Sequence, residues 1–210
     1  MATPSKIPGL EGLETEAADF HRLLGQEKSD LARVLLSLAF IDLCLASLLK
    51  EFLIDGETSK RLLQHTGVLG AFHARADMAY CLGLIPKGML QNLRALSEMR
   101  NSFAHSHLSL SFDDKDVISH CEKLTIPKSN ATAINSETGK SRETDEWHPS
   151  MFATPRDRFV LIAALIADSL MRIIAAVDKR SAMDEWLPPK NWFTMELPSD
   201  EWEKLSPTSR

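Results

Sequence analysis

The stretch Ser29–Ile54, SDLARVLLSLAFIDLCLASLLKEFLI, decides the fold. Ser29-Asp30 is a typical helix start, and Asp55-Gly56 directly after the stretch is a typical helix stop. Between them the apolar residues recur at helical spacing, at Leu31, Val34, Leu35, Leu38, Leu45, Leu48, Leu49 and Phe52. Because so much of the circumference is apolar, we expect this helix to be the central one, nearly enclosed by the others.

Five further segments have helical signals, and no stretch has the alternation of apolar and polar residues that predicts a β-strand. Four of them are residues 12–24, 69–82, 86–103 and 156–179, and the fifth is a short helix capped by Phe112-Asp113-Asp114 that ends near Leu124. Gly83 is typical of the position after a helix, and Pro86 and Pro155 are typical of a first turn. The sequence therefore predicts an all-α protein, a single up-and-down bundle of five to six helices around one long central helix.

The chain is expected to form a helical bundle domain over residues 1–180 and an extended tail over residues 181–210. Within the domain, residues 127–154 are polar and almost without periodicity, which predicts a long surface loop. The tail combines four prolines with aromatic residues, which disordered segments usually lack. Its rings either pack back on the helices or reach across to a second subunit. The predicted docking residues are Trp186, Trp192, Phe193 and Trp202.

Composition limits the class of protein. The chain has 29 acidic and 24 basic residues and a net charge of -5, which argues against direct DNA binding because such proteins usually present a basic face. The three cysteines form no CxxC pattern, so we expect free thiols in a reducing compartment. The N-terminus has no apolar signal segment, and the longest apolar run, residues 34–49, is interrupted by polar residues. We predict a cytoplasmic protein that spans no membrane.

Two carboxylates lie inside apolar helical runs. Asp42 lies in AFIDLCL and Asp168 in ALIADSL. A buried carboxylate is costly unless a donor or a cation pairs with it. The candidate partners are Arg75 and Arg100. We predict that Asp42 lies within hydrogen-bonding reach of one of these arginines, most simply as an ion pair between helices. A functional acid is the alternative.

The block Gly70–Asp114 resembles the signature of the mannitol operon repressor family. The matching residues are Gly70 and Phe72 ahead of Arg75, then the run from Ala79 through Tyr80 to Ile85, then Arg100-Asn101-x-x-Ala104-His105 and the turn from Ser111 to Asp114, with Asp42 in the preceding helix. The resemblance implies an all-helical fold and a regulatory role in repression of a sugar-alcohol uptake operon. The family has no recognisable helix-turn-helix. On this basis Asp42, Arg75, Tyr80 and His107 are candidate binding or structural residues.

The segment Arg100–His105 is also similar to the Arg-x-x-x-x-His motif of HEPN domains, helical and often dimeric bundles whose catalytic members cleave RNA without a metal. Under this alternative the catalytic residues are Arg100, Asn101 and His105: His105 acts as acid or base, and Arg100 holds the phosphate and stabilises the charge of the transition state. The structural alternative is that Arg100 neutralises a buried acid and that His105 caps a helix end. No standard zinc spacing or nucleotide-binding motif accompanies these residues, so we expect no metal and no cofactor.

Taken together, these residues predict a non-enzymatic regulatory protein. It is expected to form a homodimer or a higher homo-oligomer and to act through a protein partner. The family resemblance implies transcriptional repression as its role. The alternative is a metal-independent endoribonuclease of the HEPN type, with RNA as its partner.

Overall fold

The computed structural model describes residues 12–105, 110–128, 131–134 and 137–182. The described residues up to Arg180 belong to one compact unit, called the first unit below. The four aromatic residues predicted to dock the tail, Trp186, Trp192, Phe193 and Trp202, lie outside the described residues, as does His107.

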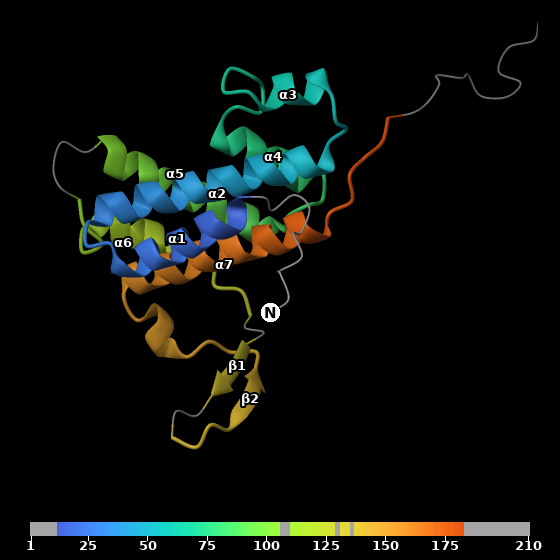
Figure 1. The fold of residues 1–210 in the computed structure, drawn as a ribbon. Helices are drawn as coiled ribbons and strands as arrows, with labels where there is room; N and C mark the ends of the chain where they lie inside the picture. Colours follow the sequence, from blue (N-terminus) through green and yellow to red (C-terminus); the bar gives the residue numbers. More distant parts are fainter. Residues whose placement is uncertain (1–11, 106–109, 129–130, 135–136, 183–210) are drawn as a thin grey trace, which may run out of the picture. The chain divides into compact units, whose positions relative to one another are not determined.

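The first unit is a helical bundle (Figure 1). Its seven described α-helices are α1 (Leu13–Gln26), α2 (Asp30–Phe52), α3 (Glu57–Leu63), α4 (Phe72–Cys81), α5 (Lys87–His105), α6 (Lys115–Glu122) and α7 (Pro155–Ala176). The predicted all-α class is confirmed. Only α3 has no counterpart among the predicted helices. It was missed because its sequence, ETSKRLL, is short and polar and contributes no buried residue.

Local chemistry fixes the ends of the two longest helices. The Ser29 hydroxyl accepts a hydrogen bond from the backbone N–H of Ala32 at the start of α2, 3.2 Å away. At the start of α7, Thr154 and Asp157 form a reciprocal capping box, and Pro155 occupies the first turn. Both arrangements satisfy backbone N–H groups that have no partner within the helix.

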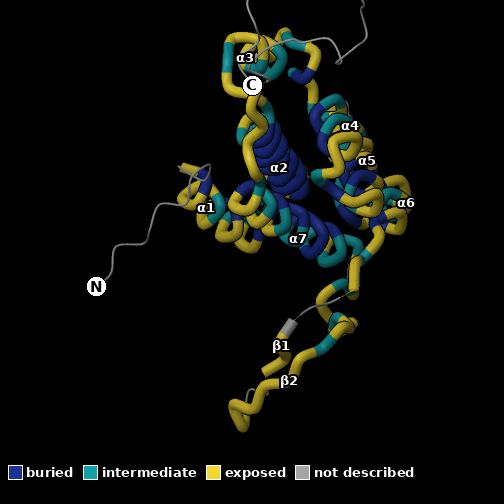
Figure 2. Tube along the Cα trace, turned by 90° about the vertical axis from the view of Figure 1, so that its right-hand side faces the viewer, coloured by how far each residue is buried: buried dark blue, intermediate teal, exposed yellow. Residues whose placement is uncertain are grey.

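The core lies where α2 packs against α7. Helices α1, α4 and α5 also pack on α2, and α6 packs on α5 and α7. Figure 2 shows the buried sides of α2 and α7 meeting inside the bundle. A row of aromatic rings extends the core toward the 111–114 turn: Phe112 lies 5.2 Å from Phe159 and 5.9 Å from Phe103, between ring centroids. Both α2 and α7 are long and apolar enough to cross a membrane, but about half of each helix is buried inside the bundle.

The segment predicted as a polar loop contains regular structure. Two short strands, β1 (Ala131–Ile134) and β2 (Ser141–Thr144), pair antiparallel, with Ala131 opposite Thr144, and a 3-10 helix, η1 (Pro149–Phe152), follows. The strands were missed because each has only four residues and because β2, SRET, is polar throughout, so no run of alternating apolar and polar residues marks them. The bundle is therefore all-α with one small hairpin in the connection between α6 and α7.

The expectation that α2 is nearly enclosed is wrong on one side. Leu31, Leu35, Leu36 and Leu43 are 38–41% exposed, and Ala39 between them is exposed as well. We call these five residues the outer face of α2. In Figure 1, α2 crosses the bundle between α1 and α4.

Candidate functional site

Asp42 and Arg75 form an ion pair between α2 and α4. The Nη1 atom of Arg75 donates to Oδ1 of Asp42 at 2.6 Å. The Arg75 side chain is 11% exposed and that of Asp42 is 34% exposed, so the cation is the more buried partner. The predicted pairing of Asp42 with an arginine is thus present. It joins the central helix to the short helix that follows the 64–71 loop.

Arg75 also holds the loop that precedes α4. Its Nε donates to the backbone carbonyl of Leu69 at 2.8 Å. The loop is tightly folded, because a Cβ atom on Gly70 would lie 2.2 Å from the carbonyl oxygen of His65. No side chain can be accommodated at that separation. Asp42, Arg75 and Gly70 therefore form one continuous structural unit that runs from α2 to the loop.

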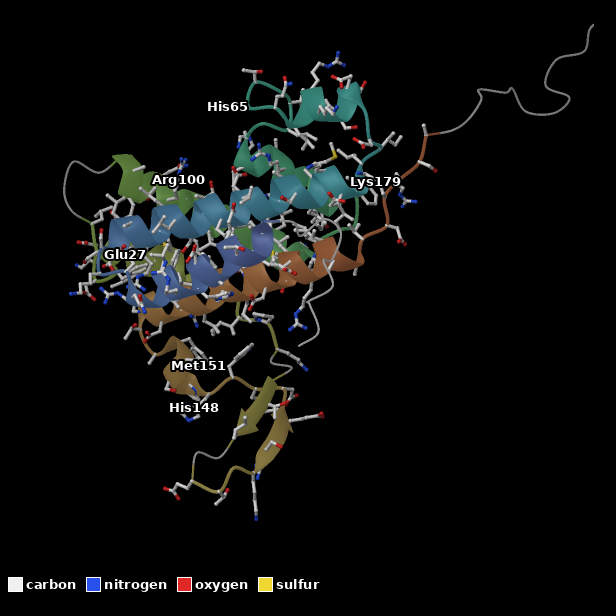
Figure 3. The ribbon with its side chains drawn as sticks, in the orientation of Figure 1. Glu27, His65, Arg100, His148, Met151 and Lys179 are labelled. Atoms are coloured by element: carbon white, nitrogen blue, oxygen red, sulfur yellow. The ribbon has the colours of Figure 1, made fainter. Side chains whose placement is uncertain are left out.

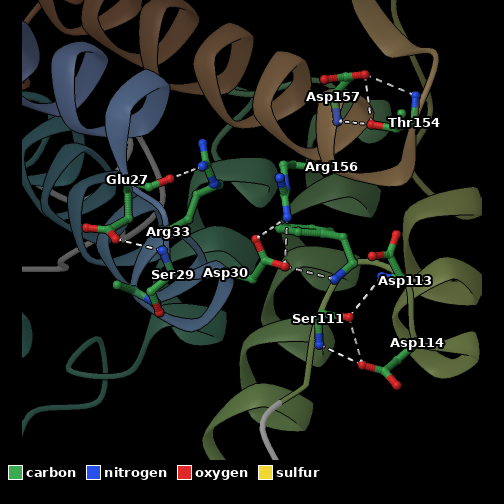
Figure 4. A network of polar contacts seen from close by, with 12 residues as sticks. Glu27, Ser29, Asp30, Arg33, Ser111, Asp113, Asp114, Thr154, Arg156 and Asp157 are labelled. Carbon is green, nitrogen blue, oxygen red and sulfur yellow. Dashed lines mark hydrogen bonds and ion pairs between the residues drawn. The ribbon is translucent and has the colours of Figure 1, made fainter.

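A second polar cluster joins the first turns of α2 and α7 to the 111–114 turn (Figure 4). Asp30, whose side chain is only 8% exposed, accepts from the backbone N–H of Phe112 at 3.1 Å. It also pairs with Arg156 at 3.0 Å, and the Arg156 guanidinium lies 5.9 Å from the Phe112 ring centroid. In the turn itself, Asp114 accepts from the backbone N–H of Ser111.

Sequence reasoning missed Asp30 as a buried acid because Asp at the start of a helix was interpreted only as a cap. Asp168 shows the opposite error. It was expected to be buried and paired with Arg75 or Arg100, but its side chain is 54% exposed and it pairs with His21 of α1 at 2.9 Å. The apolar residues around Asp168 belong to the buried side of α7, whereas Asp168 lies on the outward side.

Arg100 and Asn101 lie on the outside of α5. Figure 3 shows Arg100 on the bundle surface. Its guanidinium contacts the neighbouring residue: Nη1 donates to Oδ1 of Asn101 at 3.4 Å. Arg100 therefore neutralises no buried acid within the described residues, and that part of the structural interpretation is wrong. The backbone of His105 ends α5, but its side chain lies outside the described part of the chain.

Two apolar cavities among the described residues lie away from Arg100 and Asn101. The first, about 290 Å³, lies between α1 and α2 and is lined mainly by apolar side chains such as Phe20, Phe40 and Leu36. The second, about 370 Å³, lies between the start of α5 and α7. Its one buried polar side chain, Asn92, is already bonded to the backbone of Thr125 through both its oxygen and its nitrogen. Neither cavity gathers acids, bases or nucleophiles in an arrangement suited to catalysis.

Comparison with known proteins gives the family. The family model "Mannitol repressor" (MtlR) matches residues 34–176, well over half of the chain. The chain belongs to the mannitol repressor family. The fold is similar to a chain in the X-ray structure of the MtlR–HPr complex from Escherichia coli. The TM-score is 0.54 at 17% sequence identity, and the alignment covers 74% of this chain and 98% of that one. A search among curated proteins finds no match, and neither the family model nor this structure supports the HEPN resemblance.

The residues that carried the resemblance to the mannitol repressor family fall into two groups. Asp42, Gly70 and Arg75 hold helices and a loop together, as does the turn from Ser111 to Asp114. Arg100, Asn101 and Tyr80 are exposed and available to a partner. Within the described residues, no three His, Cys, Asp or Glu side chains are grouped so that they could hold a metal ion.

The thiols differ in their surroundings. Burial raises the pKa of Cys44 from 9.0 to about 12, and the nearby Glu16 adds to the shift. Burial also raises the pKa of Cys121 to about 12, whereas Cys81 at the end of α4 is exposed. The two core thiols are consequently protonated and inert at neutral pH.

Proposed function

We propose that this protein is a non-enzymatic regulator that acts by binding a partner protein, and that the partner is HPr or a protein that resembles it. The observation that carries the proposal is membership of the mannitol repressor family, together with the similarity of its fold to that of a chain in the MtlR–HPr complex. Transcriptional repression through this partner, rather than through direct contact with DNA, is part of the same proposal.

Charge and chemistry support this choice. The chain has 29 acidic and 24 basic residues, and the acidic balance suits a protein partner better than DNA or RNA. The two apolar cavities have no catalytic constellation, and the polar clusters around Asp30 and Asp42 are occupied in joining helices. We also propose a cytoplasmic location, because the three cysteines are free thiols, as is usual in a reducing compartment. A homo-oligomeric state stays a prediction, to be measured by sedimentation velocity.

The test is a calorimetric titration of the purified full chain with HPr from the same host. We expect saturable one-to-one binding, in the micromolar range that is common for regulatory contacts. Bovine serum albumin of equal concentration is the control for nonspecific heat. Absence of binding at about 100 μM of each protein, well above that range, would remove HPr as the partner.

A metal-independent endoribonuclease is the second candidate function. The observation in its favour is the exposure of Arg100 and Asn101, which leaves both side chains available to a phosphate. To test for endoribonuclease activity, the purified chain is incubated with host RNA in EDTA. Cleavage that leaves 2′,3′-cyclic phosphate ends would support this candidate.

A further inference from the structure

The outer face of α2 is an apolar surface on an otherwise ordinary helix bundle. Leu31, Leu35, Ala39 and Leu43 are spaced four residues apart and therefore follow one side of the helix, with Leu36 beside them. The four leucines retain 38–41% of their surface. By contrast, the exposed positions in the middle of α7 include charged residues such as Asp168 and Arg172. A helix that is apolar on its outward side usually has a further covering surface.

A groove continues this face toward α1. The cavity of about 290 Å³ between the two helices includes Leu36, Ala39 and Leu43 from the outer face. Its floor contains Phe20 and Phe40, which stack with 4.6 Å between ring centroids. The surface therefore offers both a flat apolar strip and a recess that can take an inserted apolar side chain, the arrangement found at the centre of protein interfaces.

The size of the surface favours a transient partner over a second copy of the chain. The four leucines together expose on the order of 300 Å² of apolar area, against roughly 800 Å² per partner in a standard stable interface. A permanent homodimer held by this face alone would fall well short of that area. Some transient signalling contacts bury less area than a standard interface, and a surface of this size suits such a contact.

The charged side chains at the rim of the groove indicate which charge a partner should carry. The groove has two sections: the cavity between α1 and α2, and its continuation toward the end of α2. Four charged side chains at or near the solvent line these sections, namely the acids Glu16, Asp19 and Glu51 and the base Lys50. Glu16 lines both sections and has no ion-pair partner among the described residues. Arg33, which also lines the groove, is buried and donates to the backbone carbonyls of Leu24 and Glu27. Asp19 is paired with the exposed Arg22 at 2.9 Å, so the solvent-facing rim has a small excess of acid, which comes mainly from the unpaired Glu16.

We propose that the outer face of α2 and the adjoining α1–α2 groove bind the partner protein, and that the partner presents an apolar surface flanked by basic side chains. The apolar strip supplies the desolvated centre of the contact, and the acidic rim orients the basic partner during approach. This inference rests on the proposed function, because it locates the surface that receives the same HPr-like partner.

The test uses the full chain with host HPr as the probe in calorimetric titrations. Leu36→Glu and Leu43→Glu place a charge in the centre of the surface, and each should weaken binding at least ~10-fold. Met151→Glu is the matched control. Met151 is 46% exposed, similar to the leucines, but lies in η1, which precedes α7 (Figure 3). The control should bind as the natural chain does.

Electrostatic steering is tested separately. At low salt, Glu16→Lys should bind HPr with an association rate several-fold lower than that of the natural chain. The difference between the two rates should shrink at about 0.5 M salt, because the charges are then screened. Melting temperatures of all variants show whether the fold is retained. If Leu36→Glu lowers the melting temperature, the uncharged Leu36→Gln replaces it.

The outcomes separate the two proposals. If the natural chain does not bind HPr, HPr is removed as the partner in the proposed function, and this inference is overturned with it. If the natural chain binds and Leu36→Glu and Leu43→Glu bind equally well, the function stands and the location is wrong. If sedimentation shows a dimer that Leu36→Glu dissociates, the face is an interface between copies and the inference is overturned.

Discussion

Replacing Asp42 with leucine should destabilise the bundle by leaving Arg75 without its carboxylate. Breaking a fully buried ion pair from one side costs about 3–5 kcal/mol, whereas an exposed pair contributes less than about 1 kcal/mol. The side chains of Arg75 and Asp42 are 11% and 34% exposed, with 2.6 Å between the charged atoms. Water still reaches about a third of the Asp42 side chain and therefore screens the pair. We therefore expect a loss of about 2 kcal/mol, below the fully buried limit.

The assay is urea unfolding of Asp42→Leu, Arg75→Met and the double variant, followed by circular dichroism. A coupling free energy of about 1.5 kcal/mol between the two positions is expected from a partly buried pair. The Arg94–Asp77 pair between α5 and α4 is the matched control. Its atoms are 2.8 Å apart, but its side chains are 61% and 48% exposed, so its coupling should stay below about 0.5 kcal/mol. Equal coupling in the two pairs would refute the argument from burial. Faster amide exchange in residues 64–71 of Asp42→Leu should accompany the loss, because Arg75 also holds the carbonyl of Leu69.

Three further predictions follow from the packing and the chemistry. Gly70→Ala should destabilise the protein by at least ~2 kcal/mol in the same urea assay, because the new Cβ would lie 2.2 Å from the His65 carbonyl oxygen. Gly88→Ala is the control, because a Cβ there would have nothing within 4 Å. It should be neutral or stabilise α5 by up to ~1 kcal/mol. The pKa of Cys44 and Cys121 is about 12 in the folded protein against 9.0 for a free thiol. The unfolded chain therefore releases these protons first, and stability should fall by up to about 1.4 kcal/mol per thiol for each pH unit above 9, which pH-dependent unfolding would detect. Arg100→Ala should change the free energy of unfolding by less than about 0.5 kcal/mol, since the side chain is exposed. If the natural chain cleaves RNA in EDTA and His105→Ala does not, the proposal of a non-enzymatic protein is overturned.

The long helices could be predicted from sequence because their signals are local. Ser29 was predicted to start α2, and its hydroxyl does cap that helix. Gly83 was predicted to end α4, and its φ of 72° lies in the left-handed region that glycine favours. The short helix α3 and the hairpin could not be predicted, because neither has an apolar periodicity of its own.

The polar clusters were harder to predict because a partner distant in the sequence decides them. Asp42 and Asp168 both lie in apolar runs, yet one faces Arg75 between helices and the other faces His21 near the solvent. Only the rotation of each helix about its axis distinguishes them, and packing sets that rotation. Asp30 and Arg156 are 126 positions apart, so no short motif relates them. The resemblance to the mannitol repressor family could be recognised because its residues occur in order along one block.

The most direct test of the central claim is site-specific crosslinking in the host cell. A photoreactive residue at position 36 of the full chain, in the outer face of α2, should form a crosslink to HPr. The same photoreactive residue at position 151 should not, although Met151 is 46% exposed and so similarly accessible. Captured material is scored for both protein and RNA. The account predicts HPr bound at position 36 and no RNA. Crosslinks to RNA, or none to HPr from position 36, would contradict it.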